Sequence, residues 1–323
     1  MNFKDNFNIK KIVMCLVGIM LIAYGIAAIT FFTFGKFSFE EAKSNYNKFG
    51  AHGIFHLSSH DYNYHDSKTM QLDGIDEISI DLSAGNVKFN NEGTNAIKVK
   101  VDGTITSSSS TKPQLKCYKQ GGILYIELIR DHGIIFGDYS QNIDVNISLP
   151  TAYRNNMKIV SSAGDVDISG YEFKALNCKL SAGSLVMNNM SADKFTYKNY
   201  AGDLKADNLK TKSSEVRASA GKIQITGFTG DIEGNNSAGD TDIQYNKFNN
   251  NIDLTATAGQ IELTLPKDSK FKLDAAASVG SIESNFSGIN VSGEISKSAS
   301  GEIGKSNNII KLKNTAGNIK INN

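Results

Sequence analysis

The sequence predicts an all-β protein: a parallel β-solenoid, or β-helix, of coils about 19 residues long, with an antiparallel capping section and one transmembrane helix before it. Three observations predict this class. A small-Ala-Gly motif recurs ten times along the chain. Apolar and polar residues alternate on both sides of that motif, as in strands with one buried face. An uncharged apolar run stands near the N-terminus, from Ile12 to Phe34.

The composition fits short strands joined by tight turns. The 323 residues include 29 glycines, only 3 prolines and no tryptophan. With 34 basic and 33 acidic residues the net charge is +1, which gives no electrostatic basis for a nucleic-acid partner. Cys15 lies in the apolar N-terminal run, and Cys117 and Cys178 make neither a disulfide framework nor a zinc motif. We favour two isolated thiols over a Cys117–Cys178 bridge. We expect no cofactor.

The apolar run over 12–34 is long enough to cross a membrane as a helix. It would span about 35 Å, against a hydrocarbon core of about 30 Å. Lys10 and Lys11 directly precede it, so the positive-inside rule predicts a cytoplasmic N-terminus over 1–11 and an extracytoplasmic remainder. The alternative is a cleaved signal peptide, which would have a shorter apolar core. The sequence therefore predicts a single-pass protein of the cell membrane, with residues 12–34 in the lipid bilayer.

Residues 35–70 are predicted to be a juxtamembrane linker with a short amphipathic helix over 37–49. Ser38 and Glu41 have the spacing of a capping box at the start of that helix. Apolar residues then recur at spacings of three and four, which gives the helix one apolar face.

Four of the five histidines fall in the same linker, together with Asp61 and Asp66. Imidazole and carboxylate groups are typical zinc ligands. Their spacing matches no established site, however, and the surrounding residues are polar and aromatic. We therefore favour a solvated connector over a metal site for His52, His56, His60 and His65.

The repeated motif is the strongest signal in the chain. After one long interval, its glycines follow one another every 16 to 21 residues, which composition bias cannot produce. Glycine can adopt positive φ or let a neighbouring backbone approach closely, so these residues are predicted to form the corners of stacked coils. The predicted corner glycines are Gly85, Gly164, Gly183, Gly202, Gly221, Gly239, Gly259, Gly280, Gly301 and Gly317.

The positions around each corner predict which side chains face inward. Nine of the ten residues two positions after the glycine are aliphatic, as in Val166 and Leu204. A second alternation precedes the motif, as in Leu176 and Cys178. Each repeat is therefore predicted to be two short strands that meet at the corner. One such coil buries too little apolar surface to fold alone, so the coils must stack.

An irregular all-β section separates the first motif from the others. Residues 97–101 and 143–150, and the two runs flanking Gly121, alternate as antiparallel strands would. The sequence therefore predicts a first coil with a capping β section over 71–160, and the solenoid repeats over 161–323.

From these residues the chain resembles a known family. A DLSAGNVKF opening, an ISLP strand at 147–150, repeated SAGDVDIS units and a TAGQIELTLPKDSKF segment at 257–271 occur in this order. Together they resemble the bacterial putative-adhesin β-strand-repeat family, a domain of unknown function, over about residues 75–323. The resemblance implies a cell-envelope protein, in some members linked to envelope stress. The family has no established catalytic or ligand residues, so the resemblance implies none here.

Two classes of function remain for such a chain. Parallel β-helices include polysaccharide-acting enzymes, which use carboxylate pairs. Only two corners repeat an Asp-x-Asp pattern, and outward lysines alternate with these acids, so we favour a solvated polar face and expect no enzyme. A binding or structural role at the envelope is the preferred hypothesis, with an envelope glycan or another envelope protein as partner. The outward carboxylates are Asp165, Asp167, Asp203, Asp207, Asp240 and Asp242.

Overall fold

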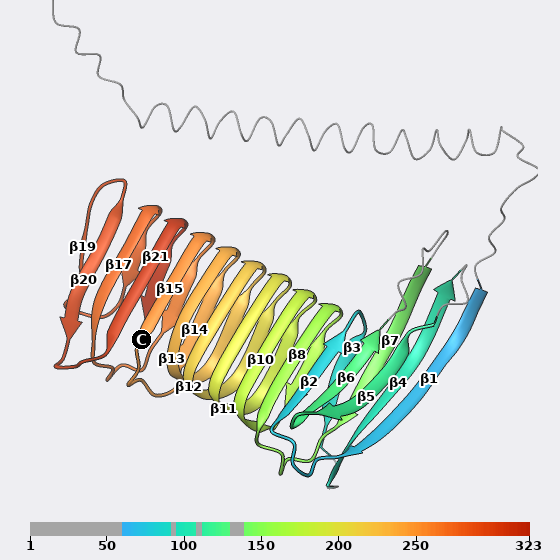
Figure 1. The fold of residues 1–323 in the computed structure, drawn as a ribbon. Coiled ribbons are helices and arrows are strands. Elements are labelled where there is room, and N and C mark those ends of the chain that lie inside the picture. The colour runs from blue at the N-terminus through green and yellow to red at the C-terminus, as the bar shows by residue number, and fades with distance from the viewer. Residues whose placement is uncertain (1–59, 92–94, 108–111, 130–138) are drawn as a thin grey trace, which may run out of the picture. The chain divides into compact units, whose positions relative to one another are not determined.

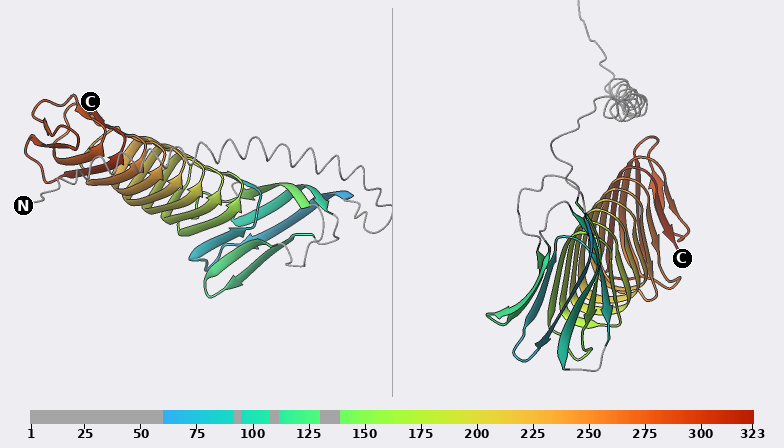
Figure 2. Two further views of the ribbon diagram at one scale, coloured as in Figure 1. Left: turned by 90° about the horizontal axis from the view of Figure 1, so that it is seen from above. Right: turned by 90° about the vertical axis from the view of Figure 1, so that its right-hand side faces the viewer.

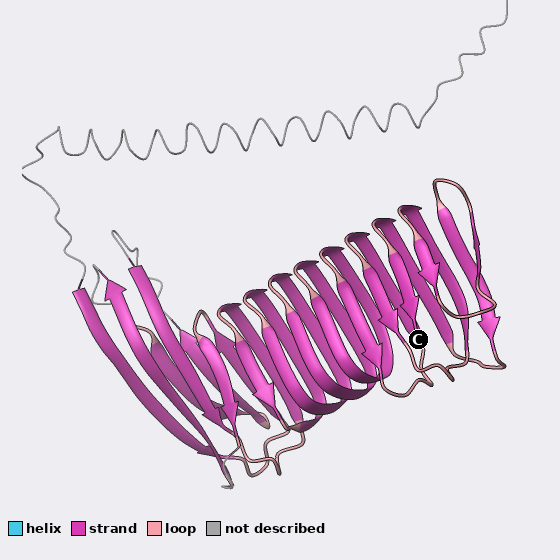
Figure 3. Ribbon diagram, turned by 180° about the vertical axis from the view of Figure 1, so that it is seen from behind, coloured by secondary structure: helices cyan, strands magenta, loops and turns pink. Residues whose placement is uncertain are grey.

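The computed structural model describes residues 60–91, 95–107, 112–129 and 139–323. All regular structure in these ranges is β-strand (Figure 3), and the prediction of an all-β, solenoid-like repeat fold is confirmed. The predicted helices over 12–34 and 37–49, and His52 and His56, lie outside the described residues. Within the described ranges, no helix is long and apolar enough to cross a membrane.

The coils cross two layers, which we call sheet I and sheet II. Sheet I holds the strands that lead into each corner, and sheet II holds the strands that leave it (Figures 1 and 2). In spatial order sheet I contains β5 (Gln114–Gln120), β6 (Ile123–Ile129), β2 (Glu77–Leu82), β8 (Asn156–Ala163), β10 (Glu172–Ala182), the second halves of β11 (Leu185–Ala201), β12 (Leu204–Ala220) and β13 (Ile223–Ala238), then β15 (Ile252–Ala258), β21 (Ile309–Ala316), β17 (Phe271–Val279), β20 (Lys297–Ile303) and β19 (Asn290–Ser292).

Sheet II is built in the same way from the strands that follow the corners. It contains β1 (His60–Gln71), β4 (Ala96–Ser107), β7 (Tyr139–Ser148), β3 (Asn86–Asn90), β9 (Val166–Ser169), the first halves of β11 to β13, then β14 (Thr241–Tyr245), β16 (Ile261–Thr264), β22 (Ile319–Asn322) and β18 (Ile282–Ser284). Because β11, β12 and β13 each bend from one layer into the other, the two layers are one continuous hydrogen-bonded sheet.

Successive coils pair in parallel and in register. Leu176 of β10, for example, pairs with Phe195 of β11, which pairs with Ser214 of β12. Register places equivalent residues about 4.8 Å apart along the stack. The same side chain therefore meets its equivalents above and below, and a substitution in one coil is felt by two others.

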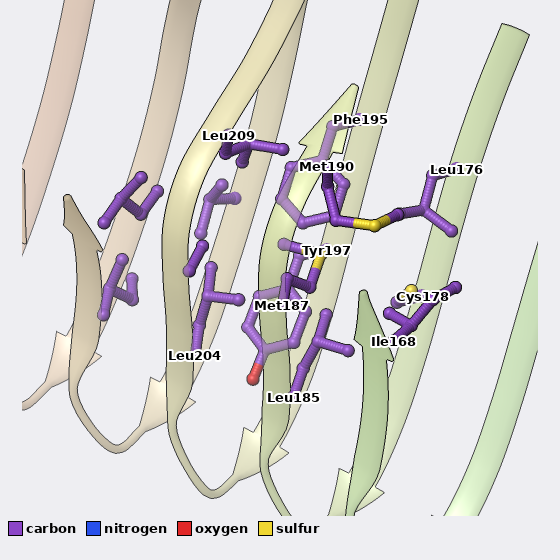
Figure 4. Packing of buried hydrophobic residues seen from close by; sticks show 14 of the residues in the cluster. Ile168, Leu176, Cys178, Leu185, Met187, Met190, Phe195, Tyr197, Leu204 and Leu209 are labelled. Atoms are coloured by element: carbon purple, nitrogen blue, oxygen red, sulfur yellow. The ribbon is translucent and has the colours of Figure 1, made fainter. Parts of the chain in front are cut away.

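The core lies between the two layers (Figure 4). Leu185 and Met187 of sheet II and Phe195 and Tyr197 of sheet I are all 0% exposed, and their side chains point toward one another. These are the inward positions that the period-2 pattern predicts. Full burial of one such aliphatic side chain contributes about 1.5–3 kcal/mol, so each coil depends on its neighbours for stability.

Nine of the ten predicted corner glycines stand at corners, with φ between 111° and 141°. At Gly202, an added Cβ would also collide with the carbonyl oxygen of Gly183 in the preceding coil. The backbone N–H of Gly202 meanwhile donates to the carbonyl oxygen of Ala220 in the next coil, at 3.1 Å. Both the backbone conformation and the close approach of the coils exclude a side chain here.

The tenth predicted corner, Gly301, is wrong. Gly301 lies inside β20 and pairs with Leu273 of β17 in an antiparallel ladder. Its φ is not positive, unlike those of the nine corner glycines. The reason is that β20 folds back on β17 and β19 as an antiparallel hairpin, so this segment forms no coil.

The order of coils in space differs from their order in sequence at the C-terminal end. Strands β21 and β22, the last in the chain, lie between the coil of β15 and β16 and the coil of β17 and β18 (Figure 1). The corner glycines accordingly stack in the order Gly259, Gly317, Gly280. The last coil is therefore covered on both sides, and Leu312 and Ile319 are 0% exposed.

Antiparallel strands lie at the other end of the stack. Strand β4 pairs in antiparallel fashion with both β1 and β7, and β5 pairs likewise with β6. The predicted linker over 35–70 requires a correction here, because its last part, from His60 on, is strand β1. The side chain of Tyr64 is buried there, so what reads as a polar connector has one apolar face.

Candidate binding face

The outward side chains of sheet I form straight rows, because the coils are in register. One row carries Lys179 of β10, Lys198 of β11 and Arg217 of β12, which are direct register partners. We call these three residues the cationic row. Like charges placed directly opposite one another on neighbouring strands destabilise a sheet. Neighbouring carboxylates offset this repulsion at Lys198 and Arg217, so fold stability leaves only Lys179 unexplained.

A groove of about 600 Å³ follows the cationic row on the outer surface of sheet I. Tyr200 lines the groove and is 61% exposed, although the motif at each of the other eight corners has Ser or Thr at its position. The remaining outward side chains are uncharged and polar: Asn177, Thr196, Ser219, Asn235 and Ser237. Among the described residues that line the groove there is no carboxylate. We call it the basic groove.

A second groove of about 530 Å³ lies beside the first on the same sheet, toward β15 and β21. We call it the acidic groove, because its carboxylates outnumber its two lysines, Lys194 and Lys311. Ile309, which is 43% exposed, supplies an apolar part of its lining. Its carboxylates are Glu215, Asp231, Glu233 and Asp253.

Ion pairs link the two grooves. Arg217 donates from Nε to Glu215 at 2.7 Å and from Nη2 to Glu233 at 3.1 Å. Lys198 Nζ lies 3.4 Å from the same Glu215 carboxylate. The hydrogen bond from Arg217 lowers the pKa of Glu215, so this carboxylate is charged at neutral pH. These pairs hold two members of the cationic row in place, while Lys179 makes no ion pair with the described residues.

Four of the six outward aspartates weighed as catalytic groups are hydrogen-bonded to neighbouring coils. Asp165, Asp203 and Asp240 each follow a corner glycine, and each accepts a hydrogen bond from the backbone N–H of the equivalent residue in the next coil, at 2.7–2.9 Å. Asp207 accepts from the Thr226 hydroxyl at 2.7 Å. Asp167 accepts from Ser169 at 3.4 Å. Asp165, Asp203, Asp207 and Asp240 therefore tie one coil to the next, whereas the Asp167 bond stays within strand β9.

Asp242 is the remaining aspartate of the six, and its pKa is raised. Partial burial raises its pKa, and the neighbouring Glu262 carboxylate raises it further, while Lys222 lowers it. Glu262 in turn accepts hydrogen bonds from Gln260 and Asn322. Asp242 and Glu262 are register partners on sheet II, on the layer opposite the two grooves.

The histidines and cysteines that the structure describes do not form a site. His65 Nδ1 lies 2.8 Å from Asp102, and both side chains are on the surface. Across the residues that the structure describes, no three His, Cys, Asp or Glu side chains are arranged to hold a metal ion. Cys117 and Cys178 are free thiols, and burial raises the pKa of Cys178 to about 12, which leaves it unreactive at neutral pH.

Sequence reasoning missed the grooves and found only the scaffold that carries them. Tyr200 was detectable, since it is the only aromatic residue at the first position of the ten motifs. The cationic row was not, because Lys179, Lys198 and Arg217 become neighbours only when the coils are aligned residue by residue.

The fold and this surface define the class: a solenoid-like all-β repeat protein with a broad polar outer face. Its sequence matches the model of the family described as Toastrack DUF4097 over residues 75–322, and the chain belongs to this family. No curated protein of similar sequence was found.

A comparison with solved structures found matches at low identity. A putative cell adhesion protein from Clostridium sporogenes is 19% identical, with 81% of this chain and 99% of that chain covered and a TM-score of 0.26. A putative adhesin from Bacteroides fragilis is 12% identical, with 80% and 97% covered and a TM-score of 0.44. One from Parabacteroides distasonis is 13% identical, with 80% and 97% covered and a TM-score of 0.33.

Proposed function

We propose that this protein has a binding or structural role at the bacterial cell envelope, with residues 12–34 as its membrane anchor and the repeats outside the membrane. The role we propose is not enzymatic. The uncharged run over 12–34, preceded by Lys10 and Lys11, supports the anchor and its orientation. The partner we propose is an envelope glycan or another envelope protein.

One observation carries the binding role: two grooves of opposite charge lie side by side on one regular sheet. The backbone ladders fix the spacing of the outward rows, so a ligand meets side chains that are already positioned. A preorganised surface loses little conformational entropy on binding. The exposed Tyr200 suits such a role as well, since aromatic side chains are enriched at interfaces.

Protease treatment of intact cells tests the topology. We expect an added protease to degrade the repeats while a cytoplasmic marker stays intact, and we expect the mature chain to retain residues 12–34. A mature N-terminus near residue 29, or repeats that stay protected until the cells are lysed, would contradict the proposal.

Capture from solubilised cell envelope tests the binding role. The full chain should retain an envelope component, and retention should fall when Tyr200 is replaced by serine, the residue found in the coils on both sides. Equal retention by the unaltered chain and by a variant with Tyr200, Lys179 and Lys198 all replaced would remove sheet I as the binding face.

A further inference from the structure

The cations of the cationic row are spaced as the strands are. This spacing indicates a ligand with several anionic groups along its length. Lys179, Lys198 and Arg217 come from three consecutive coils, so their backbones follow one another about every 4.8 Å along the stack. An extended linear polymer lying across the strands would meet one cation per coil. A polysaccharide with one carboxylate on each sugar is the polymer that this row suits, because it carries anionic groups along its whole length and these can pair with lysine and arginine.

Tyr200 adds a second recognition element to the basic groove. It stands beside the cationic row, on the same strand as Lys198, and is 61% exposed. The C–H-rich face of a sugar ring is apolar and packs on the face of an aromatic ring, which carries a partial negative charge from the ring quadrupole. The uncharged polar side chains of the groove, such as Thr196 and Asn235, can bond to sugar hydroxyls.

The charges around the two grooves favour the basic groove as the place where an anionic ligand binds. Glu215 and Glu233 hold Arg217 from the side of the acidic groove and do not line the basic one. An anionic polymer is therefore attracted to the basic groove and repelled from its neighbour. The acidic groove crosses the same strands β11 to β13 farther from the corner, so it limits the ligand to the part of sheet I nearest the corners.

We propose that the basic groove of sheet I binds an acidic polysaccharide with a carboxylate on each sugar, held by Lys179, Lys198 and Arg217 and stacked on Tyr200. This inference rests on the proposed binding role and names the ligand class for it. The polymer would run along the stack, perpendicular to the strands.

Titration calorimetry with a galacturonic acid hexasaccharide tests this on the full chain in a neutral, sugar-free detergent. Cellohexaose, of equal length and without carboxylates, is the control ligand. We expect the hexagalacturonate to bind and its affinity to fall with added salt, and cellohexaose to bind at least about tenfold more weakly, since it lacks the charge contacts.

Matched variants assign the site. Lys179→Gln with Lys198→Gln should weaken binding about tenfold, and Tyr200→Ser about fivefold. Lys88→Gln with Lys205→Gln removes two exposed cations from sheet II and should leave the affinity within about twofold. Thermal melts of all variants should match the unaltered chain, because every altered side chain is on the surface.

Three results would overturn the proposal: no binding of hexagalacturonate, equal binding of cellohexaose, or equal loss from the sheet II control variant. A glycerol phosphate oligomer that binds in place of hexagalacturonate would overturn the carboxylate assignment. If hexagalacturonate fails while the chain still captures an envelope component through Tyr200, this inference fails and the proposed function stands. Self-association in sedimentation that disappears in the sheet I variants would instead assign the groove to a second copy of the chain.

Discussion

The side-chain amide of Asn199 donates a hydrogen bond of 2.9 Å to the carbonyl oxygen of Gly183, the corner glycine of the preceding coil. Asn236 and Asn314 make the equivalent bond to Gly221 and Gly259, at 3.0 and 2.8 Å. From Asn199 on, asparagine and alanine alternate at this inward position along the stack. A buried asparagine thus satisfies the backbone of every second corner in this part of the stack.

Replacing Asn199 by alanine tests this arrangement. Alanine fits the position, since Ala218 is the register partner of Asn199 in the next coil. The variant leaves the Gly183 carbonyl without this donor and removes the 2.8 Å bond to the Tyr197 hydroxyl. We expect the free energy of unfolding to fall by about 1–3 kcal/mol. Ser219→Ala, on the outward side of the next coil, should change it by less than about 0.5 kcal/mol. Equal effects in urea unfolding would show that the asparagine bond contributes nothing.

The bond from Asn199 also shows which features could be predicted from the sequence and which could not. Nine corner glycines and the inward aliphatic columns follow from the repeat spacing alone. The inward position of Asn199 could not be predicted in this way, because an amide interrupts the apolar alternation and resembles an outward residue. Strand β1 was missed for a related reason: its inward Tyr64 stands among polar residues, and only its pairing with β4 shows that this face is buried.

The position of the last coil predicts a specific cross-link. Asp253 of β15 is the register partner of Lys311 of β21, whereas Asp274 of β17 lies one strand further away. With both residues replaced by cysteine, the 253–311 pair should form a disulfide readily, because neighbouring strands fall within disulfide range. The 253–274 pair spans about 9.6 Å and should not.

Peptide mapping after mild oxidation distinguishes the two pairs, with Cys117→Ser in both chains to remove the partly exposed native thiol. If the coils instead stacked in sequence order, β15 would lie beside β17 and the 253–274 pair would cross-link preferentially. The sequence could not decide between these orders. Ile310, Leu312 and the corner at Gly317 would suit any slot in the stack.

The raised pKa of Asp242 predicts that the stability of the fold depends on pH. Its pKa is raised in the folded state, so the folded protein holds this proton more tightly than the unfolded chain does. The resulting contribution is fully present below the unfolded pKa of 3.8 and is lost as the pH rises through the folded pKa. Asp242→Asn should therefore raise the melting temperature at pH 7, and the gain should shrink as the pH falls toward 3.8.

Glu262 provides the control for this effect, since its carboxylate is one cause of the raised pKa. In a Glu262→Gln background the gain from Asp242→Asn should be smaller. A gain that is constant from pH 3 to pH 7, or a loss at pH 7, would show that the Asp242 carboxylate is not under strain from burial and repulsion.

The central claim is that each coil turns at its glycine and that side chains then alternate between core and solvent. Gly202, Leu204 and Lys205 test it within four residues. Gly202 has φ 130° and meets the Gly183 carbonyl, Leu204 is 0% exposed, and Lys205 points outward. Urea unfolding of three single variants of the full chain is the most direct measurement. We expect Gly202→Val to lower the free energy of unfolding by about 2–5 kcal/mol, and Leu204→Asp by at least as much. Lys205→Val should stay within about 0.5 kcal/mol of the unaltered chain. Equal effects of all three substitutions, or Lys205→Val as the most damaging, would contradict the assignment of inward and outward positions on which the candidate binding face depends.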